Sequence, residues 1–462
     1  MKNTNYNAPY VWISSFVAAL GGLLFGYDWV VIGGAKPFYE KFFHLTSSFE
    51  IGWAMSSALL GCLAGSILSG AFSDRFGRKR LLMLAGLLFT SSAVGTALSD
   101  SFNTFVTFRL LGGVGIGLAS NLAPMYIAEL APPSLRGKFV SINQLAIVVG
   151  ILAAQLTNWI IAKPVPPDAT AMDILNSWNG QVGWRWMFGA ETVPAFLFFC
   201  AMFFVPESPR WLVKNGKDSK AIHILQKVGG PGYQKSAFND IKQSLKNEIQ
   251  RVHFRELLEP RLLRILIIGI ALAVLQQWCG INVIFNYAED IFSAAGFGVS
   301  DILFNIVITG TVNLLFTFVA LYTVDRWGRR PLMLIGTGGL TVIYIFIGIS
   351  YVLQSSGVHL LLLVVLAIGT YGMSLAPVVW VVISEIFPNR IRGAAMAVSV
   401  SALWIACFVL TYTFPYLNRG LGAAGTFWVY AGICVLGFLF IKTKLPETKG
   451  KSLEEIEKEL VD

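Results

Sequence analysis

The sequence predicts an all-α membrane protein with twelve transmembrane helices in two pseudo-symmetric six-helix bundles. Hydrophobic residues make up 55% of the 462 residues and charged residues only 13%, whereas a soluble domain carries about 25% charged residues. Long apolar runs recur along the chain, each long enough to cross a hydrocarbon core. Polar motifs of the first half return in the second half, which indicates two related bundles in one chain.

The apolar runs are continuous rather than alternating, and each exceeds the roughly ten residues of a barrel strand, so helices are predicted. The sequence defines the boundaries of these runs to within several residues. The runs cover about 11–34, 51–73, 80–98, 103–125, 138–161, 185–205, 264–287, 302–324, 331–353, 359–384, 394–416 and 425–442.

Three polar motifs lie between these runs, and each occurs once in each half of the chain. A bundle repeated in this way is typical of secondary transporters. The pairs are DRFGRKR at 74–80 with DRWGRR at 325–330, Glu129…Arg136-Gly137 with Glu385…Arg392-Gly393, and PESPR at 206–210 with PETKG at 446–450.

The net charge of +9 comes from basic residues in alternate loops, on the same side as the segment 206–262 and the C-terminal tail. The opposite loops hold little more than Lys36, Lys41, Lys163 and Arg419. The positive-inside rule therefore places both termini in the cytoplasm, and the basic excess indicates topology rather than nucleic-acid binding. The absence of any Asn-x-Ser/Thr sequon favours a bacterial inner membrane.

These observations predict four parts of the chain. Within 206–262, residues 217–228 and 238–257 mix charged and apolar residues at helical spacing, which predicts short amphipathic helices on the cytoplasmic face. The parts are an N-terminal bundle at 1–205, a cytoplasmic helical linker at 206–262, a C-terminal bundle at 263–445 and a cytoplasmic tail at 446–462.

The chain shows no sign of enzyme chemistry. Its five cysteines all lie in apolar runs without CxxC spacing, and its four histidines are scattered. No metal, cofactor or catalytic residue is therefore predicted, because no nucleophile, metal cluster or acid–base group is visible.

These motifs resemble those of the major facilitator superfamily and, within it, the sugar porters, over nearly the whole chain. The clusters at 74–80 and 325–330 match the superfamily loop motif, and 206–210 and 446–450 match the sugar-porter signatures. The stretch 276–282, QQWCGIN, is similar to the family's seventh helix. The resemblance implies the major facilitator fold and alternating-access transport of a monosaccharide by a monomer in a lipid bilayer.

Apart from residues at the ends of the runs, three charged residues lie within apolar runs. Asp28 is in the first run, Arg109 in the fourth and Glu191 in the sixth. An unpaired charge at that depth costs roughly 2.5–3.5 kcal/mol, so Asp28 and Arg109 are expected to face each other or water. By resemblance, Asp28 matches the proton-coupling aspartate of bacterial sugar–proton symporters, and Glu191 matches a carboxylate that takes over Arg109. The alternative is a purely structural ion pair.

A sugar site needs amides for adjacent hydroxyls and aromatic rings for the C–H face. On a straight helix Gln277 and Asn282 would lie about 140° apart, but Gly280 between them permits a break. For Gln144 and Asn313 a helix–helix hydrogen bond is the alternative, and for the lone aromatics it is apolar packing. The candidates, partly from the resemblance, are Gln144, Gln276, Gln277, Asn282, Asn313, Trp380, Phe25 and Trp404.

Two positions bear on which sugar is carried. Ile151 and Phe285 resemble glucose carriers, whereas xylose carriers of the family have glutamine and leucine there. A hexose such as glucose is therefore predicted over xylose, with xylose as a competitor. Asn286, Ala376 and Leu403 depart from the usual family pattern, and the last two make the C-terminal side of the site more apolar.

The charged motifs are expected to form a cytoplasmic gate. Their cations can pair with carboxylates and helix C-termini across the two halves, and such pairs would form when that side closes. The alternative is that they only anchor the topology. The gating candidates are Asp74, Arg75, Arg78, Glu129, Arg136, Glu207, Arg210, Asp325, Arg326, Arg329, Glu385, Arg392 and Glu447.

Other functions fit less well. A facilitative uniporter would keep the sugar site and lose the coupling, and Asp28 argues against it. A sugar sensor would need a long signalling tail, and about 16 residues follow Pro446. A drug–proton antiporter does not match the segment 276–282. Proton-coupled symport of a monosaccharide is the predicted function.

Overall fold

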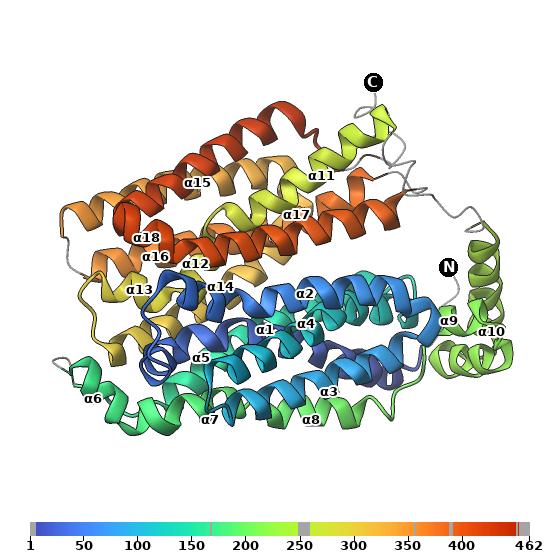
Figure 1. The fold of residues 1–462 in the computed structure, drawn as a ribbon. Coiled ribbons are helices and arrows are strands. Elements are labelled where there is room, and N and C mark those ends of the chain that lie inside the picture. Colours follow the sequence, from blue (N-terminus) through green and yellow to red (C-terminus); the bar gives the residue numbers. More distant parts are fainter. Residues whose placement is uncertain are drawn as a thin grey trace.

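The structure is a computed structural model that describes residues 6–166, 169–247, 259–354, 357–387, 391–449 and 451, without the side chains of 246, 247, 325 and 392. In this part of the chain every regular element is a helix (Figure 1). The first half and the linker contain α1 (Ala8–Phe42), α2 (Ser48–Phe76), α3 (Arg78–Ala97), α4 (Phe102–Leu130), α5 (Arg136–Ile161), α6 (Ala171–Asn176), η1 (Asn179–Gly183), α7 (Trp184–Gly189), α8 (Thr192–Ala201), α9 (Pro209–Lys214) and α10 (Asp218–Asn247).

The second half contains α11 (Pro260–Trp278), α12 (Ile281–Asn286), α13 (Ala288–Ser293), α14 (Val299–Trp327), α15 (Arg329–Val352), α16 (Gly357–Met373), α17 (Leu375–Ile386) and α18 (Arg392–Lys444). In this half two of the predicted spans are divided into shorter helices, one into α11 and α12 and the other into α16 and α17.

The predicted fold class is confirmed. Among the described residues, ten helical segments are long and apolar enough to cross a membrane. One of them, 393–444, holds the eleventh and twelfth predicted spans, because the chain turns at Gly422 with φ 68°. The sixth predicted span consists of the shorter helices α7 and α8, which are separated at Ala190 and Glu191. The ten segments therefore account for eleven of the twelve predicted spans, and α7 with α8 accounts for the sixth.

Local sequence signals set several helix ends. The Ser47 hydroxyl accepts a hydrogen bond from the Glu50 backbone N–H, and the Glu50 carboxylate accepts one from the Ser47 backbone N–H, so α2 begins with a capping box. Ser208 caps α9, whose first residue is Pro209, a residue that suits the first turn. Gly229 and Gly230 interrupt α10, which confirms the predicted break between amphipathic helices; residues 248–258 lie outside the described part.

Small residues let the membrane helices approach closely. Gly61 and Gly65 of α2 face Gly113 and Gly117 of α4, and a Cβ at Gly113 would lie 1.9 Å from the carbonyl oxygen of Ala58. Such close backbone contact drives helix association where lipid removes the hydrophobic effect.

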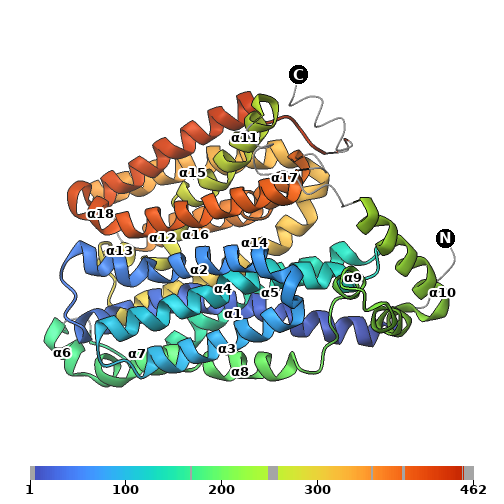
Figure 2. The ribbon, with the colours of Figure 1, turned by 45° about the vertical axis from the view of Figure 1, so that its right-hand side comes forward.

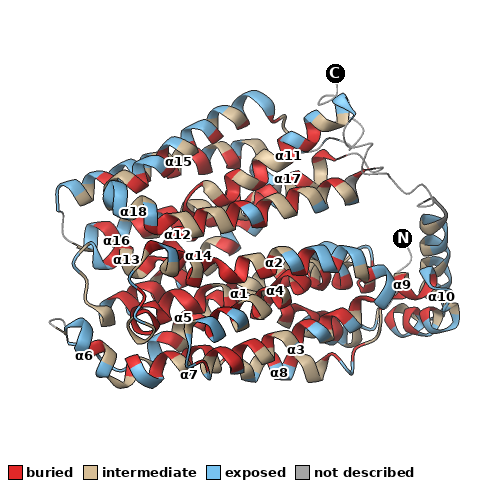
Figure 3. Ribbon diagram, in the orientation of Figure 1, coloured by how far each residue is buried: buried red, intermediate tan, exposed pale blue. Residues whose placement is uncertain are grey.

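Large apolar side chains lie on the outside of the bundle, where Figure 3 shows exposed residues on the outer helices. Phe204 is 88% exposed and Ile160 is 71% exposed. A soluble monomer rarely exposes apolar surface on this scale, so this surface suits contact with lipid.

The long helices form two groups, one from the first half and one from the second (Figures 1 and 2). We call the end near Arg78, Arg329 and α9 the basic end, and the end near α13 the opposite end. The groups touch near the opposite end, where the Val165 backbone N–H donates to Ser300 Oγ at 3.0 Å. A Cβ on Gly52 would there lie 2.6 Å from the carbonyl oxygen of Tyr412.

Candidate functional site

Asp28 of α1 and Arg109 of α4 form a buried ion pair. Arg109 Nη1 donates to Asp28 Oδ1, and Arg109 Nη2 donates to the Asp28 backbone carbonyl oxygen at 3.2 Å. The Asp28 and Arg109 side chains are 2% and 3% exposed. Because an isolated charge in the membrane interior costs roughly 2.5–3.5 kcal/mol, the contact keeps both charges tolerable at this depth. The expected contact between these residues is therefore present.

A second buried carboxylate lies beside this pair. Glu191 is 3% exposed and occupies the break between α7 and α8. It interacts electrostatically with both Asp28 and Arg109. Glu191 Oε1 and Asp28 Oδ2 have no hydrogen-bond partner among the described residues. The Arg109 guanidinium therefore interacts with two carboxylates, Asp28 and Glu191, and it forms its ion pair with Asp28.

A break in the seventh predicted span brings two amides together. The helices α11 and α12 meet at Gly280, whose φ is 85°, in the left-handed region that favours glycine. Across this break, Asn282 Nδ2 donates to Gln277 Oε1 and lies 3.6 Å from Cys407 Sγ. The predicted break at Gly280 is confirmed, and it overcomes the 140° separation of a straight helix.

Gln276 extends these amides into a row. Gln277 Nε2 donates to Gln276 Oε1 at 3.4 Å. Gln276 Nε2 donates to the carbonyl oxygens of Ala376 at 3.1 Å and Leu375 at 3.4 Å, which lie at the start of α17. The row Asn282–Gln277–Gln276 is buried and offers donors and acceptors in the interior of the bundle.

The remaining substrate candidates lie on other helices. Gln144 and Ile151 are two turns apart on α5, Phe285 is in α12, Asn313 is in α14 and Trp380 is in α17. Ile151, Phe285 and Asn313 are 9%, 6% and 6% exposed, Gln144 is half-buried, and Trp380 is 38% exposed. The hydrogen bonds of the described residues do not connect these side chains to the amide row.

Three aromatic rings meet between the halves. The rings of Phe25 and Trp29 of α1 lie 5.8 Å apart, and the Trp404 ring of α18 lies 6.1 Å and 5.9 Å from them. Trp404 is 3% exposed, and its Nε1 has no partner among the described residues. Phe25 and Trp404 were expected at the site, whereas Trp29 was missed, although its spacing of four from Phe25 places both on one helix face.

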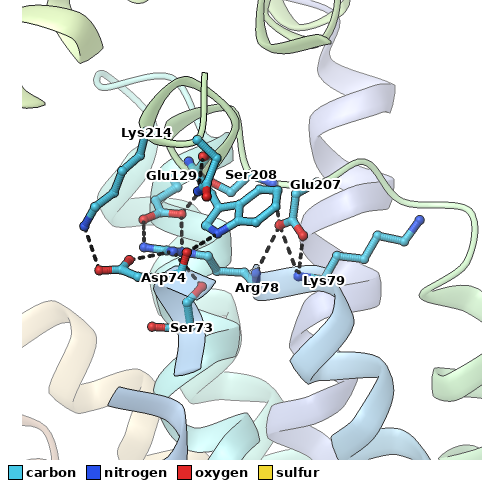
Figure 4. Close-up of polar contacts among 10 residues, drawn as sticks. Ser73, Asp74, Arg78, Lys79, Glu129, Glu207, Ser208 and Lys214 are labelled. Atoms are coloured by element: carbon cyan, nitrogen blue, oxygen red, sulfur yellow. Dashed lines mark hydrogen bonds and ion pairs between the residues drawn. The ribbon is translucent and has the colours of Figure 1, made fainter. Parts of the chain in front are cut away.

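Charged residues at the basic end of the first half form a closed network (Figure 4). Arg78 contacts Glu129 at 3.0 Å and Asp74 at 3.1 Å. The Glu207 carboxylate accepts hydrogen bonds from the backbone N–H groups of Arg78 and Lys79, each at 3.1 Å. Burial raises the pKa of Glu207, although these hydrogen bonds and the Arg78 charge act in the opposite direction.

The second half repeats the network. Arg329 contacts Glu385 at 3.1 Å. The Glu447 carboxylate accepts from the backbone N–H groups of Arg329 at 3.0 Å and Arg330 at 3.1 Å. Gly77 and Gly328 precede the two arginines with φ values of 93° and 92°, so the sequence repeat is also a repeat of backbone geometry.

Each of these contacts joins residues of one half, whereas the predicted pairing across the halves belongs to a state that is closed at this end. Arg75 and Arg326 contact the rings of Phe76 and Tyr322, and Arg326 Nη1 also donates to the Tyr322 hydroxyl. The other gating candidates are Arg136 at the start of α5, Arg210 in α9, and Asp325 and Arg392, whose side chains lie outside the described part.

The fold and these sites define a polytopic membrane carrier of the major facilitator type. The family described as "Sugar (and other) transporter" matches residues 14–460, and the chain belongs to this family. Its members are transporters, so the prediction that the chain is not an enzyme is confirmed.

The chain is similar to curated proteins over nearly its whole length. It is 40% identical to the D-xylose-proton symporter of Escherichia coli (strain K12), with 98% of this chain and 96% of that protein covered. It is also 40% identical to the glucose transport protein of Synechocystis sp., with 97% of each chain covered. The inward open structure of the xylose transporter XylE from E. coli is 37% identical, with a TM-score of 0.84 over 97% of this chain and 99% of that one.

Two further buried polar residues, Gln155 and Lys36, were not among the site residues predicted from the sequence. Gln155 of α5 is 1% exposed, and both of its amide atoms lack partners among the described residues. It faces Gly310 of α14, where a Cβ would lie 1.7 Å from Gln155 Oε1. Its spacing of four from Ile151 was an available signal. Lys36 is also buried, and nothing in the sequence pointed to its partners 253 residues away.

Proposed function

We propose that the chain is a proton-coupled symporter of a monosaccharide in a bacterial cytoplasmic membrane. The observation that carries this proposal is the buried pair of Asp28 and Arg109 with Glu191 beside it. A proton on Asp28 removes the charge that holds Arg109, and the guanidinium can then turn to Glu191. One protonation thereby changes the pairing between α1, α4 and the sixth span, which gives the two states that coupling requires.

The membrane potential sets the free energy that is available for this coupling. Each proton that crosses 100 mV contributes about 2.3 kcal/mol, which supports a sugar gradient of somewhat under a hundredfold. The family of the chain and the sugar–proton symporter among its relatives support this assignment.

The substrate site of the proposal is the amide row with the aromatic residues around it. Gln276, Gln277 and Asn282 would bind adjacent hydroxyls, and Trp380, Phe25 and Trp404 would supply ring faces to the C–H surface of a pyranose. Gln144 and Asn313 would complete the site from α5 and α14. The break at Gly280 supports this assignment, because carriers build their sites from discontinuous helices near the midplane.

A hexose such as glucose is the proposed substrate, with xylose as a competitor. A hexose carries a hydroxymethyl group that xylose lacks. Ile151 offers no hydrogen-bonding group that would compete for the place of this hydroxymethyl group, and Phe285 offers apolar contact to it. A contact of this size discriminates by only about 1–3 kcal/mol, so the two sugars should overlap. The relatives include a xylose symporter and a glucose transport protein at the same identity, so overall identity does not separate the two sugars, and the proposed preference is based on Ile151 and Phe285.

The orientation of the proposal follows from charge. The basic end would face the cytoplasm, together with both termini, the linker 206–262 and the tail 446–462. The bundles 1–205 and 263–445 would then rock against each other in a functional monomer. The contacts between the halves at the opposite end support an inward-facing state. The networks of Arg78 and Arg329 would meet across the halves in the outward-facing state.

Uptake by proteoliposomes tests the proposal. An imposed pH gradient should drive accumulation of glucose, with xylose as a competitor. Asp28→Asn should abolish accumulation and leave counterflow exchange measurable, because the aspartate carries the coupling and not the sugar. Asp301→Asn, an exposed carboxylate in the first turn of α14, is the matched control. Unchanged accumulation by Asp28→Asn would indicate that the ion pair is only structural, and no accumulation by the wild type would indicate an uncoupled uniporter.

A further inference from the structure

A buried lysine lies between the halves at the opposite end. Lys36 Nζ of α1 lies 3.2 Å from Glu40 Oε1 of the same helix. It also lies 2.8 Å from Glu289 Oε2 and 2.9 Å from Asp290 Oδ2, both of α13 in the other half. The Lys36 side chain is 2% exposed. We call these four residues the Lys36 cluster, and it is an ion-pair group that joins the two halves.

The cluster lies next to a close approach of the halves. About one turn before Lys36, a Cβ at Gly33 would lie 2.9 Å from the carbonyl oxygen of Phe285 and 3.0 Å from that of Asn286. The helices α1 and α12 therefore touch through their backbones beside the ion pairs. If the halves separate at this end, Lys36 must leave Glu289 and Asp290, because they lie on different halves.

The charges in the cluster do not balance. Three carboxylates lie within ion-pair distance of one ammonium, which leaves an excess negative charge in a largely buried group. Like charges that are close and poorly solvated favour protonation of one of them. The other titratable or charged groups around the cluster are Tyr39, Lys41, Tyr287, Tyr351 and Arg109.

Of the two carboxyl groups on α13, Asp290 is the better placed to hold a proton. Burial raises its pKa, the Lys36 charge lowers it and Glu289 raises it again, with a net upward direction. For Glu289, burial acts upward, but Lys36 brings the net pKa below its ordinary value. The Asp290 side chain is 28% exposed and lines a cavity of about 10 Å³ with Asn418 and Thr426. This is about the space for one water, which gives a proton a route to the carboxyl group.

We propose that the Lys36 cluster is a proton-binding lock of the outer gate: the halves close around Lys36 with a proton on Asp290, and loss of this proton favours opening. This proposal rests on the proposed transport function and adds a proton site separate from Asp28. Protons outside the cell would then favour closure at the outer end, which is the direction in which a symporter carries proton and sugar together.

The sign of the pH effect follows from linkage. In the open gate Asp290 faces water with an ordinary carboxyl pKa of about 3.9, whereas the closed gate binds the proton more tightly. The closed state is therefore favoured at low pH and loses population as pH rises through the closed-state pKa. One linked proton changes the closed-to-open ratio by up to tenfold per pH unit.

The distance between spin labels at the opposite end tests the lock. Leu98, at the end of α3, and Leu353, at the end of α15, are 71% and 69% exposed on different halves. Both would be replaced by labelled cysteine in a Cys200→Ser background, because Cys200 is the half-buried one of the five cysteines. Asp28→Asn is included throughout, so that titration of Asp28 does not contribute. Pulsed electron paramagnetic resonance in lipid nanodiscs would then give the closed and open populations as a function of pH.

In this background the short-distance population should fall as pH rises. Asp290→Asn should keep the gate closed and remove the pH dependence. Lys36→Met should lower the closed-to-open ratio by more than tenfold, whereas Lys163→Met, which changes an exposed lysine at the same end of the first half, should leave it nearly unchanged. Lys36→Arg, which keeps the charge, should retain closure and remains informative if Lys36→Met does not fold.

Three results would overturn the lock: a label distance independent of pH before Asp290 is changed, the same pH dependence after Asp290→Asn, or equal populations in Lys36→Met and Lys163→Met. The label measurement needs neither sugar nor a proton gradient. A failure of the proposed symport function would instead appear in the uptake assay, with the label distances unaffected.

Discussion

Replacing Gly280 by alanine tests whether the break between α11 and α12 builds the amide row. Gly280 has φ 85°, and a non-glycine residue in this conformation costs roughly 1–2 kcal/mol. The added Cβ would lie 2.8 Å from Cγ of the Tyr430 ring, so the ring or the helix must move. Overpacking of this kind costs about 1–3 kcal/mol. The single added methyl group should therefore lower the free energy of unfolding by roughly 2–5 kcal/mol.

The same shift should weaken sugar binding. Movement at Gly280 separates Gln277 from Asn282, and a lost hydrogen bond in a desolvated site costs about 1–3 kcal/mol, or roughly five- to 150-fold in affinity. Calorimetric titration with glucose would measure the affinity, and thermal unfolding of the purified protein would measure the stability.

Gly432→Ala is the matched control, because a Cβ at Gly432 of α18 meets no atom within 4 Å. Gly280→Ala should have a lower melting temperature and a weaker affinity than this control. If the two variants have the same melting temperature and affinity, the strained break does not position the amides, and this reasoning is wrong.

Three further predictions concern the site and the basic end. Gln277→Ala and Asn282→Ala should each weaken sugar binding by more than about tenfold in calorimetric titration, since each removes a hydroxyl partner worth roughly 1–3 kcal/mol; near-wild-type affinity in both would place the cavity elsewhere. Ile151→Gln with Phe285→Leu should shift competition assays toward xylose, and a wild type that carries xylose but ignores glucose would refute this view of the two positions. Glu207→Ala should lower the melting temperature, because it leaves the backbone N–H groups of Arg78, Lys79 and Ser208 without their acceptor; an unchanged melting temperature would show that water replaces the carboxylate at no cost.

The sequence predicted the fold because lipid imposes strong local constraints. Every span must be apolar and must satisfy its own backbone, so the runs could be found without tertiary information. The sixth span breaks at Ala190 and Glu191, and Pro194 was an available signal, because it cannot donate the helical hydrogen bond to the Ala190 carbonyl oxygen. The break at Gly280 was predictable because a glycine separates two amides that a straight helix cannot bring together.

The Lys36 cluster was not predictable, although Lys36 was noticed as one of the few charges in the opposite loops. Its partners Glu289 and Asp290 lie on the other half, and their contact depends on how the two bundles dock. Local periodicity carries no information about docking. The pairing of Arg78 with Glu129 inside one half was missed because local periodicity does not show which helix ends of one bundle lie side by side.

The two carboxylate networks at the basic end also have a consequence for biogenesis. Glu207 bonds to the backbone of residues 129 and 128 positions earlier, and Glu447 repeats this with a separation of 118. Each tie joins the last part of its half to an early loop of the same half. Domains generally fold as units during synthesis, N-terminal first. The first six spans can therefore form these stabilising contacts as soon as Glu207 has emerged from the ribosome, before the second half has been synthesised.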